Sequence, residues 1–453
     1  MDFNNDIIWS GKEWITPKYP PEVSSDGVSF EKLDGSEELK NSFKDNSVEY
    51  FWTGSNYLVY YSQNAHTYMA YLSSKYLYRI SEDMKTIIDT YEIPDNRWIN
   101  KIIAYNDTYY ISTEKVVPKY LNGEGSRVYG EDVCDFEIFF CNDFTNWQIL
   151  ELPFELQKHE IRPSILTADG TNMLIVNYES GEGSLSGFGE FYRGLNCKNV
   201  GIISNNTVYS VNYEDICGKE FNVCGDYYYT ELGDDGFSEQ IAFSKDGIYW
   251  DKINLTGQSR LLKVYESNGD IIIKCFNDGN TTYNICNKSD LYAQLINAKY
   301  NHTYIRLNDK ILGFAQPPVI ESDRTLVPMR FLFEQMGAEV DWDDATQTAT
   351  ATISNTVAKG FVDSAAAVGL AEQGTAIDSK AKPLAANTAG DTNSVTFSID
   401  DTNATVNGEA ATMDVPARLI NDQTFVPLRF LSENLGYDVQ WDESTNTAII
   451  TTE

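Results

Sequence analysis

The sequence predicts a mainly β chain: an N-terminal β-propeller of five to seven blades, followed by small α+β modules in tandem. In the N-terminal part, short runs rich in tyrosine and β-branched residues are broken by Asn/Asp/Gly turns about every eight to twelve residues, the spacing of an antiparallel β protein. Of 29 tyrosines only Tyr437 lies beyond Tyr304, where alanine and threonine take over. Because 453 residues exceed one ordinary core, this shift indicates a domain boundary.

Four segments follow from this boundary and from a duplication described below. They are the propeller (residues 1–302), a first α+β repeat (303–353), an alanine- and threonine-rich insert (354–392) and a second α+β repeat (393–453). The strands expected in the propeller include Tyr57–Tyr61, Lys101–Tyr105, Tyr109–Ser112, Met173–Tyr178, Tyr227–Thr230 and Ile271–Phe276.

A weak repeat selects the propeller among antiparallel folds, with an array of β-sandwiches as the alternative. Four aspartates, Asp26, Asp83, Asp143 and Asp246, each precede a large apolar residue by four positions. The best copy, Ser244–Trp250, resembles the Asp-box turn of sialidase-type propellers, shortened by one residue. We expect the carboxylate to accept N–H groups of the turn and the aromatic residue to wedge between neighbouring sheets. Degenerate copies are expected at Ser204–Tyr209 and Cys286–Tyr292.

The C-terminal region contains a strong duplication. Residues 324–337 align without gaps with residues 423–436, and the matched residues differ by 99 positions throughout. Each copy predicts a helix of about three turns, with Pro328 or Pro427 in its first turn and Gly337 or Gly436 as its C-terminal cap. The strands expected after the helices are Glu339–Asp343, Thr348–Ile353, Asp438–Asp442 and Thr447–Thr451.

The duplicated motif, Thr-Leu/Phe-Val-Pro-Leu/Met-Arg-Phe followed by Glu-x-x-Gly and Val-x-Trp-Asp, resembles the copper amine oxidase N-terminal-like, or stalk, domain over about residues 303–453. This resemblance implies a structural, spacer-like or attachment role without oxidase chemistry. Copper amine oxidases need three histidine ligands, yet no histidine lies beyond His302. We therefore expect no copper and no other cofactor, and the sequence leaves Ca²⁺ at the acidic turns open.

The net charge of the chain limits the classes of molecule that it can bind. A formal net charge of −33 repels nucleic acid phosphates and anionic lipids. There is no apolar run of the ~18 residues that span a bilayer, and no secretory signal is visible, so either a signal was removed or the chain is made in the cytosol. The seven cysteines predict buried thiols in a reducing compartment, with Cys134/Cys141 and Cys217/Cys224 as alternative short-range pairs.

Three arginines, Arg97, Arg162 and Arg260, each precede a turn by seven to nine residues. With Trp98 and Trp52, they are candidates for a ring around the propeller channel that binds an anion or a sugar. The alternative is local pairing with the abundant Asp and Glu. If the ring exists, Arg97→Ala and Arg162→Ala each weaken binding of an anionic glycan without unfolding the protein.

The sequence therefore favours a non-enzymatic recognition protein that binds a bacterial cell-surface glycan or wall polymer. Its other expected partners are structural proteins of a particle or cell wall. We expect it outside the cell, on a virion as a bacteriophage tail or baseplate component, or on the surface of a Gram-positive bacterium. Two alternatives stay open: a purely structural role, and a sialidase-type glycoside hydrolase, which needs an Asp acid/base and a Tyr/Glu nucleophile pair.

Overall fold

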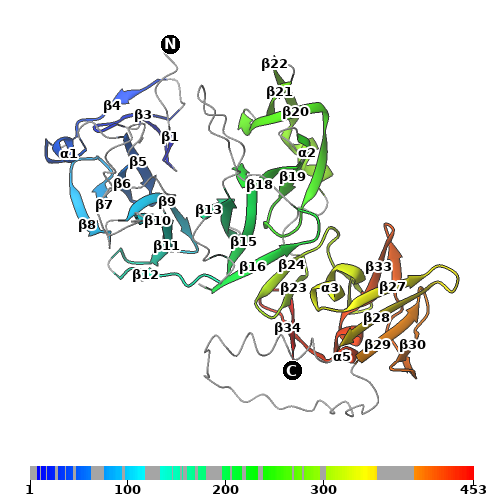
Figure 1. Cartoon of the computed structure of the whole chain (residues 1–453). Coiled ribbons are helices and arrows are strands. Elements are labelled where there is room, and N and C mark those ends of the chain that lie inside the picture. Colours follow the sequence, from blue (N-terminus) through cyan, green and yellow to red (C-terminus); the bar gives the residue numbers. More distant parts are fainter. Residues whose placement is uncertain are drawn as a thin grey trace, which may run out of the picture. The chain divides into compact units, whose positions relative to one another are not determined.

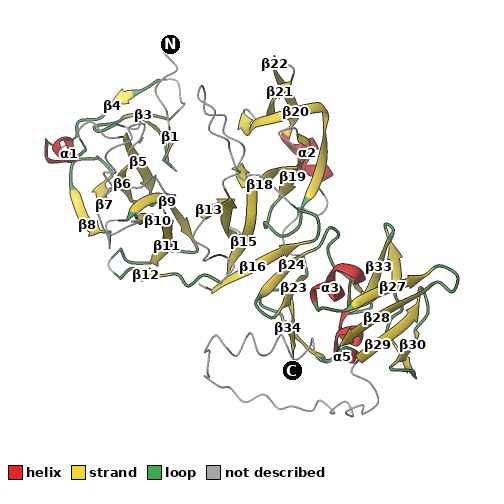
Figure 2. Ribbon diagram, viewed as in Figure 1, coloured by secondary structure: helices red, strands yellow, loops and turns green. Residues whose placement is uncertain are grey.

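The computed structural model is drawn in Figure 1, and strands dominate it (Figure 2). It describes residues 8–10, 12–16, 18–25, 29–35, 37–43, 47–62, 76–93, 97–117, 133–144, 146–153, 156, 161–168, 172–179, 196–204, 207–216, 221–232, 238–267, 270–277, 280–295, 302–354 and 392–452. In these ranges, no helix has both the length and the apolar character needed to cross a membrane.

The chain forms two compact units. The first comprises residues 1–208 and 218–237, and the second comprises residues 209–217 and 238–453. The domain boundary predicted at residue 302 is drawn from the change in amino-acid composition and from the repeats, whereas the two units are defined by their contacts. The boundary at residue 302 therefore stays a prediction.

The first unit is built from antiparallel sheets whose strands follow one another along the chain. The orders are β1-β2-β3-β4, β5-β6-β7-β8 and β12-β11-β10-β9, and β13-β14-β15 and β17-β18 continue the pattern. The bounds are β1 (Ile8–Trp9), β2 (Trp14–Ile15), β3 (Glu22–Ser24), β4 (Glu31–Lys32), β5 (Ser47–Trp52), β6 (Asn56–Ser62), β7 (Tyr76–Ser81), β8 (Ile87–Glu92), β9 (Trp98–Tyr105), β10 (Thr108–Val117), β11 (Val133–Cys141), β12 (Gln148–Ile149), β13 (Ile161–Ala168), β14 (Asn172–Glu179), β15 (Asn196–Ser204), β17 (Phe221–Cys224) and β18 (Tyr227–Leu232). A short helix, α1 (Glu37–Ser42), precedes β5.

Successive sheets of the first unit pack face to face. One apolar core joins Leu58 and Leu77 of the β5–β8 sheet to Ile102 and Ile111 of the β9–β12 sheet. The next core joins the β9–β12 sheet to β13, β14 and β15. The leading strands also adjoin, because β9 lies beside β13 and β13 lies beside β17. Four-stranded meanders that meet through their first strands are the blades of a β-propeller, which confirms the predicted fold, while the blade number stays a prediction.

The second unit begins with the end of β16 (Thr207–Tyr213), and its antiparallel strands β19 (Ser238–Ser244), β20 (Asp251–Ser267), β21 (Asp270–Asn277) and β22 (Asn280–Asn287) follow. A short helix, α2 (Lys288–Gln294), comes after β22 and is capped by the side chain of Asn287. The degenerate Asp-box copy predicted at residues 286–292 is therefore wrong, because this stretch continues from a strand into a helix.

The repeated aspartates lie in the turns between the third and fourth strands of their sheets. The carboxylates of Asp83, Asp143 and Asp246 each accept a backbone N–H two or three residues later, at 2.8–3.2 Å. The residue after each aspartate has positive φ: Met84 at 60°, Phe144 at 61° and Gly247 at 76°. The predicted hydrogen bonding between the carboxylate and the turn is thus confirmed at three copies. Asp26 lies between β3 and β4 but outside the described residues.

Of the three described turns, only that of Asp246 has glycine at its left-handed position. We expect Gly247→Ala to lower the free energy of unfolding by about 1 kcal/mol, because an added Cβ disfavours positive φ. Urea unfolding followed by tryptophan fluorescence measures this change. Met84 and Phe144 show that the turn accepts a side chain, so the variant should still fold. An unchanged midpoint would mean that the turn adjusts at no cost.

The duplicated region shares its sheets between the two copies. Their strands are β23 (Tyr304–Leu307), β24 (Lys310–Gly313), β25 (Val319–Glu321), β26 (Arg324–Pro328), β27 (Glu339–Asp343) and β28 (Thr348–Ser354) in the first copy, then β29 (Thr392–Ser398), β30 (Asn403–Val406), β31 (Glu409–Thr412), β32 (Arg418–Ile420), β33 (Gln423–Pro427), β34 (Tyr437–Asp442) and β35 (Thr447–Thr452). Within the second unit, the sheet orders are β16-β24-β23-β35-β34, β25-β26-β33-β32 and β27-β28-β29-β30-β31. Each sheet thus combines strands of both copies.

The helices of the two copies are α3 (Met329–Gln335) and α5 (Leu428–Asn434), each about two turns long instead of the expected three. Each proline ends the preceding strand and occupies the N-cap position, one residue before the predicted place. The glycine caps are confirmed, since Gly337 (φ 82°) and Gly436 (φ 95°) follow the helices in the left-handed conformation. The Ala/Thr-rich insert lies outside the described residues except for Ser354 and Thr392.

Four of the cysteines are described, and they bear on the prediction of buried thiols in a reducing compartment. Cys141, Cys224 and Cys275 are buried, and Cys286 is half-buried. Cys141 carries a free thiol, so the alternative Cys134/Cys141 pair is not formed. Burial raises the pKa of the Cys141 thiol to about 11, which keeps it protonated and unreactive at neutral pH.

Candidate functional site

The arginines of the predicted ring lie at or within strands. Arg97 immediately precedes β9 and is only 2% exposed, with its Nε 2.9 Å from a carboxylate oxygen of Glu137 on β11. Arg162 is the second residue of β13, the neighbour of β9. Arg260 lies in β20 of the second unit. The side chains of Arg162 and Arg260 are outside the description, so their convergence stays a prediction.

The two predicted tryptophans differ in what the structure describes. Trp98 begins β9, and its side chain lies outside the description. Trp52 ends β5 and is half-buried, with its ring 4.8 Å from that of Tyr57 and the Lys12 ammonium 4.5 Å from its centroid. The faces of Trp52 are therefore already used in packing within the β5–β8 region.

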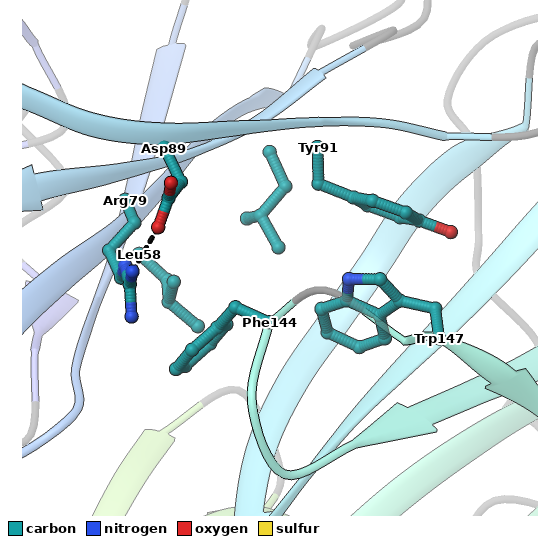
Figure 3. A pocket seen from close by; sticks show the side chains of 7 residues that line it. Leu58, Arg79, Asp89, Tyr91, Phe144 and Trp147 are labelled. Atoms are coloured by element: carbon teal, nitrogen blue, oxygen red, sulfur yellow. Dashed lines mark hydrogen bonds and ion pairs between the residues drawn. The ribbon is translucent and has the colours of Figure 1, made fainter.

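A different group of residues forms a depression in the first unit (Figure 3). It lies where the sheet of β6, β7 and β8 meets the turn between β11 and β12, and it is a shallow depression with enclosed room for about one water molecule. Its lining consists of Leu58, Leu77, Arg79, Asp89, Tyr91, Phe144 and Trp147. Two aromatic residues, Phe144 and Trp147, thus come from the Asp143 turn, and Trp147 is the residue at the predicted wedge position.

The aromatic rings form one wall of this depression. The rings of Tyr91 and Trp147 lie 4.9 Å apart at 32°, and Phe144 lies 4.3 Å from Tyr109. In Figure 3 the indole nitrogen of Trp147 points into the enclosed space. This buried Nε1 has no hydrogen-bond partner among the described residues.

The opposite wall is charged. Arg79 and Asp89 are cross-strand partners on β7 and β8 and form an ion pair. The Arg79 guanidinium also lies 5.0 Å from the centroid of Phe144. Partial burial raises the pKa of Tyr91 to about 12, so its hydroxyl stays a neutral donor at physiological pH.

These features suit a sugar ring. An aromatic surface can pack against the apolar C–H face of a pyranose that lies across the opening of the depression, while Arg79 offers donors and Asp89 an acceptor for hydroxyl groups. The sequence indicated only part of this site. The Asp143 repeat marked Trp147 as a wedge residue, but nothing in the sequence showed that Arg79 and Asp89 would pair across strands beside it.

No group of three His, Cys, Asp or Glu side chains in the described ranges is arranged to hold a metal ion. The only histidine in those ranges, His302, packs edge-on against Tyr249 at 5.0 Å. The predictions of no copper and no other cofactor remain predictions.

Comparison with known proteins supports the C-terminal resemblance. The family model of the copper amine oxidase N-terminal domain matches residues 306–389 and 372–450. No curated protein is significantly similar to the chain.

Several solved structures resemble the chain at low identity and low TM-score. Synechocystis apocarotenoid oxygenase is 12% identical, with a TM-score of 0.39 over 65% of this chain and 70% of that one. The β-propeller domain of the Trilobed protease from Pyrococcus furiosus is 10% identical, with a TM-score of 0.35 over 61% and 82%. A PL25 ulvan lyase is 10% identical, with a TM-score of 0.36 over 61% and 70%. A mainly β chain with propeller-type sheets and two C-terminal matches to the copper amine oxidase N-terminal domain fits a recognition or structural role.

Proposed function

We propose that this protein binds a polysaccharide through its propeller-type sheets and that its duplicated C-terminal region holds it on a larger assembly. The main support for this proposal is the depression of Figure 3, where the Tyr91 and Trp147 rings face a polar Arg79–Asp89 pair. Such a mixture of apolar walls and few polar groups is typical of ligand sites. The ligand we propose is a glycan of a bacterial cell surface or wall.

The composition of this site favours binding over hydrolysis. Asp89 is the one carboxylate in the lining, and it is engaged by Arg79. Glycosidases generally need two carboxyl groups, or a tyrosine nucleophile with its own base, on either side of the bond they cleave. A fluorogenic sialoside assay tests the remaining alternative, because turnover would establish an enzyme.

The C-terminal region supports an attachment role. Its family match covers the duplicated copies, and these share sheets with each other, so they form one body. We propose that this body anchors the protein outside the cell, in a bacteriophage tail or baseplate. A Gram-positive cell-surface protein is the alternative. Detection of the chain in purified phage particles or in a washed cell-wall fraction distinguishes the two.

The binding proposal predicts that Trp147→Ala weakens binding to purified Gram-positive wall polysaccharide about tenfold, or about 1.4 kcal/mol. Affinity electrophoresis with the polysaccharide in the gel measures this change. Trp342→Ala is the matched control, because Trp342 is 39% exposed on the C-terminal repeat. Equal retardation of the two variants and the unchanged chain would refute the site, provided that circular dichroism shows both variants folded.

A further inference from the structure

The two copies of the duplicated region differ in how the edge of one of their sheets is covered. In the first copy, the outer edge of β24 is covered by β16, which pairs with it in parallel from Ser210↔Lys310 to Tyr213↔Gly313. Glu214, directly after β16, strengthens the junction: its N–H donates to Gly313 at 2.9 Å and its carboxylate accepts the N–H of Ala315 at 2.8 Å.

The equivalent strand of the second copy is β31, since Lys310 and Glu409 differ by the repeat offset of 99. Among the described strands, β31 is the last of its sheet and only its inner side is paired, by β30. The two copies therefore present the same kind of edge, one of which is covered within the chain.

The backbone of β31 directs hydrogen-bonding groups outward. Asn407 and Gly408 both have positive φ, 50° and 85°, which makes the β30–β31 connection a two-residue hairpin turn. In such a hairpin the first pair, Val406↔Glu409, exchanges hydrogen bonds, and the next pair, Thr405↔Ala410, points its N–H and C=O groups away. Ala410 corresponds to Ile311, which faces Val211 of β16.

The side chains also differ between β27 and β31, which are the two edge strands of the β27–β31 sheet. The opposite edge, β27, carries carboxylates at Glu339, Asp341 and Asp343, and such charges discourage the addition of another strand. The centre of β31 is Ala410 and Ala411, two small uncharged residues that allow a backbone to approach. Among the described residues, no further strand and no charged side chain protects the centre of β31.

Charge indicates the kind of strand that fits. Glu409 stands where the covered edge has Lys310, and Asp401 lies close by in sequence, whereas Asp414 is paired with Arg324 at 2.7 Å. Residues 305–453 contain 22 acidic and 9 basic residues, and the whole chain carries −33. A second copy of this chain would be repelled, whereas a basic segment would be attracted.

We propose that the edge of β31, centred on Ala410, binds an extended basic segment of a partner protein as a parallel strand, as β24 binds β16 within the chain. Main-chain hydrogen bonds supply the affinity and Glu409 selects positive charge. The duplicated region is then a connector with two equivalent edges: one holds the chain's own β16 and the other holds the partner. The proposal rests on the attachment part of the proposed function and is independent of the Trp147 site.

A random dodecapeptide library selected on the full-length chain tests this proposal. The enriched peptides should alternate β-branched residues with Lys or Arg, and their affinity should fall at least tenfold on Ala410→Pro, which removes an outward N–H but no β30–β31 hydrogen bond. Ala410→Lys is the second variant, because it keeps the N–H and repels a basic strand. Retained polysaccharide binding and an unchanged circular dichroism spectrum show that each variant is folded.

Three results would overturn the proposal: no enriched peptide sensitive to either substitution, enrichment of acidic peptides, or self-association that Ala410→Pro abolishes. Sedimentation velocity detects the third, which would make a second copy the occupant. Loss of polysaccharide binding in Trp147→Ala with peptide binding intact would leave this inference standing, so its failure is separable from that of the glycan site.

Discussion

Asp246→Ala is expected to lower the free energy of unfolding of the second unit by about 3–5 kcal/mol. Asp246 is fully buried, and its carboxylate accepts four hydrogen bonds. The donors are the backbone N–H groups of Ile248 and Tyr249, at 2.8 and 3.0 Å, and the hydroxyls of Ser244 and Tyr304, at 3.1 and 2.9 Å. Alanine leaves these donors buried without their acceptor.

The loss should spread beyond the turn because the turn holds the start of the duplicated region. Tyr304, which binds the carboxylate, is the first residue of β23. The Tyr249 hydroxyl donates to the carbonyl of Thr303 at 2.8 Å, and its ring stacks on Tyr304 at 5.7 Å. The Asp-box turn thus fastens β19 and β20 to the first strand of the C-terminal repeat.

Urea unfolding followed by tryptophan fluorescence measures this change, and Asp83→Ala is the matched control. Asp83 occupies the same place in its own turn but is exposed, so a much smaller loss is expected. Asp246→Asn should cost less than Asp246→Ala, since the amide oxygen still accepts the two turn N–H groups. If Asp83→Ala and Asp246→Ala lowered the free energy of unfolding equally, burial of the Asp246 turn would contribute nothing to stability.

The pH dependence of stability gives a second readout. Burial raises the pKa of Asp246, so the folded chain holds this proton more tightly than the unfolded chain does. The stabilisation of the folded chain that comes from binding this proton is therefore fully present below the pKa of Asp246 in the unfolded chain, near 4. It is lost as pH rises through the higher pKa of Asp246 in the folded chain. Asp246→Asn should remove this part of the pH dependence, and an unchanged profile would contradict the shift.

Much of the architecture was predictable because it depends on local patterns. The apolar runs at Tyr57–Tyr61 and Ile271–Phe276 lie within β6 and β21, as expected for short runs rich in tyrosine and β-branched residues. The 99-residue offset located both helices and their glycine caps. Each helix also carries an ion pair between residues four positions apart, with Arg330 and Glu334 3.5 Å apart and Arg429 and Glu433 3.0 Å apart.

The sharing of sheets between the copies could not be predicted from the sequence. The parallel pairing of β23 with β35 joins residues more than 140 positions apart, and no local propensity encodes such a contact. The same holds for the depression, where β7 and β8 meet the Asp143 turn. The later start of each helix has a local cause instead: both prolines end strands, so each helix begins one residue later than expected.

Arg97→Ala is expected to lower the free energy of unfolding of the first unit by about 3 kcal/mol. The substitution removes a large side chain that is 2% exposed, and it leaves the carboxylate of Glu137 without this partner. Thermal unfolding followed by circular dichroism measures the loss. Arg97→Met fills more of the space, so it should be less destabilising, and Arg97→Met with Glu137→Leu should recover further stability, because an apolar pair can replace a buried ion pair.

The same variants decide between the two roles considered for Arg97. A ligand-binding arginine gives a variant that unfolds like the unchanged chain and binds an anionic glycan more weakly. An arginine that stabilises the fold through Glu137 gives a destabilised variant whose remaining folded fraction binds glycan normally. Because a guanidinium that is 2% exposed and 2.9 Å from a carboxylate offers little free surface to a ligand, we expect the second result. Full stability with lost glycan binding would restore the arginine ring as the binding site.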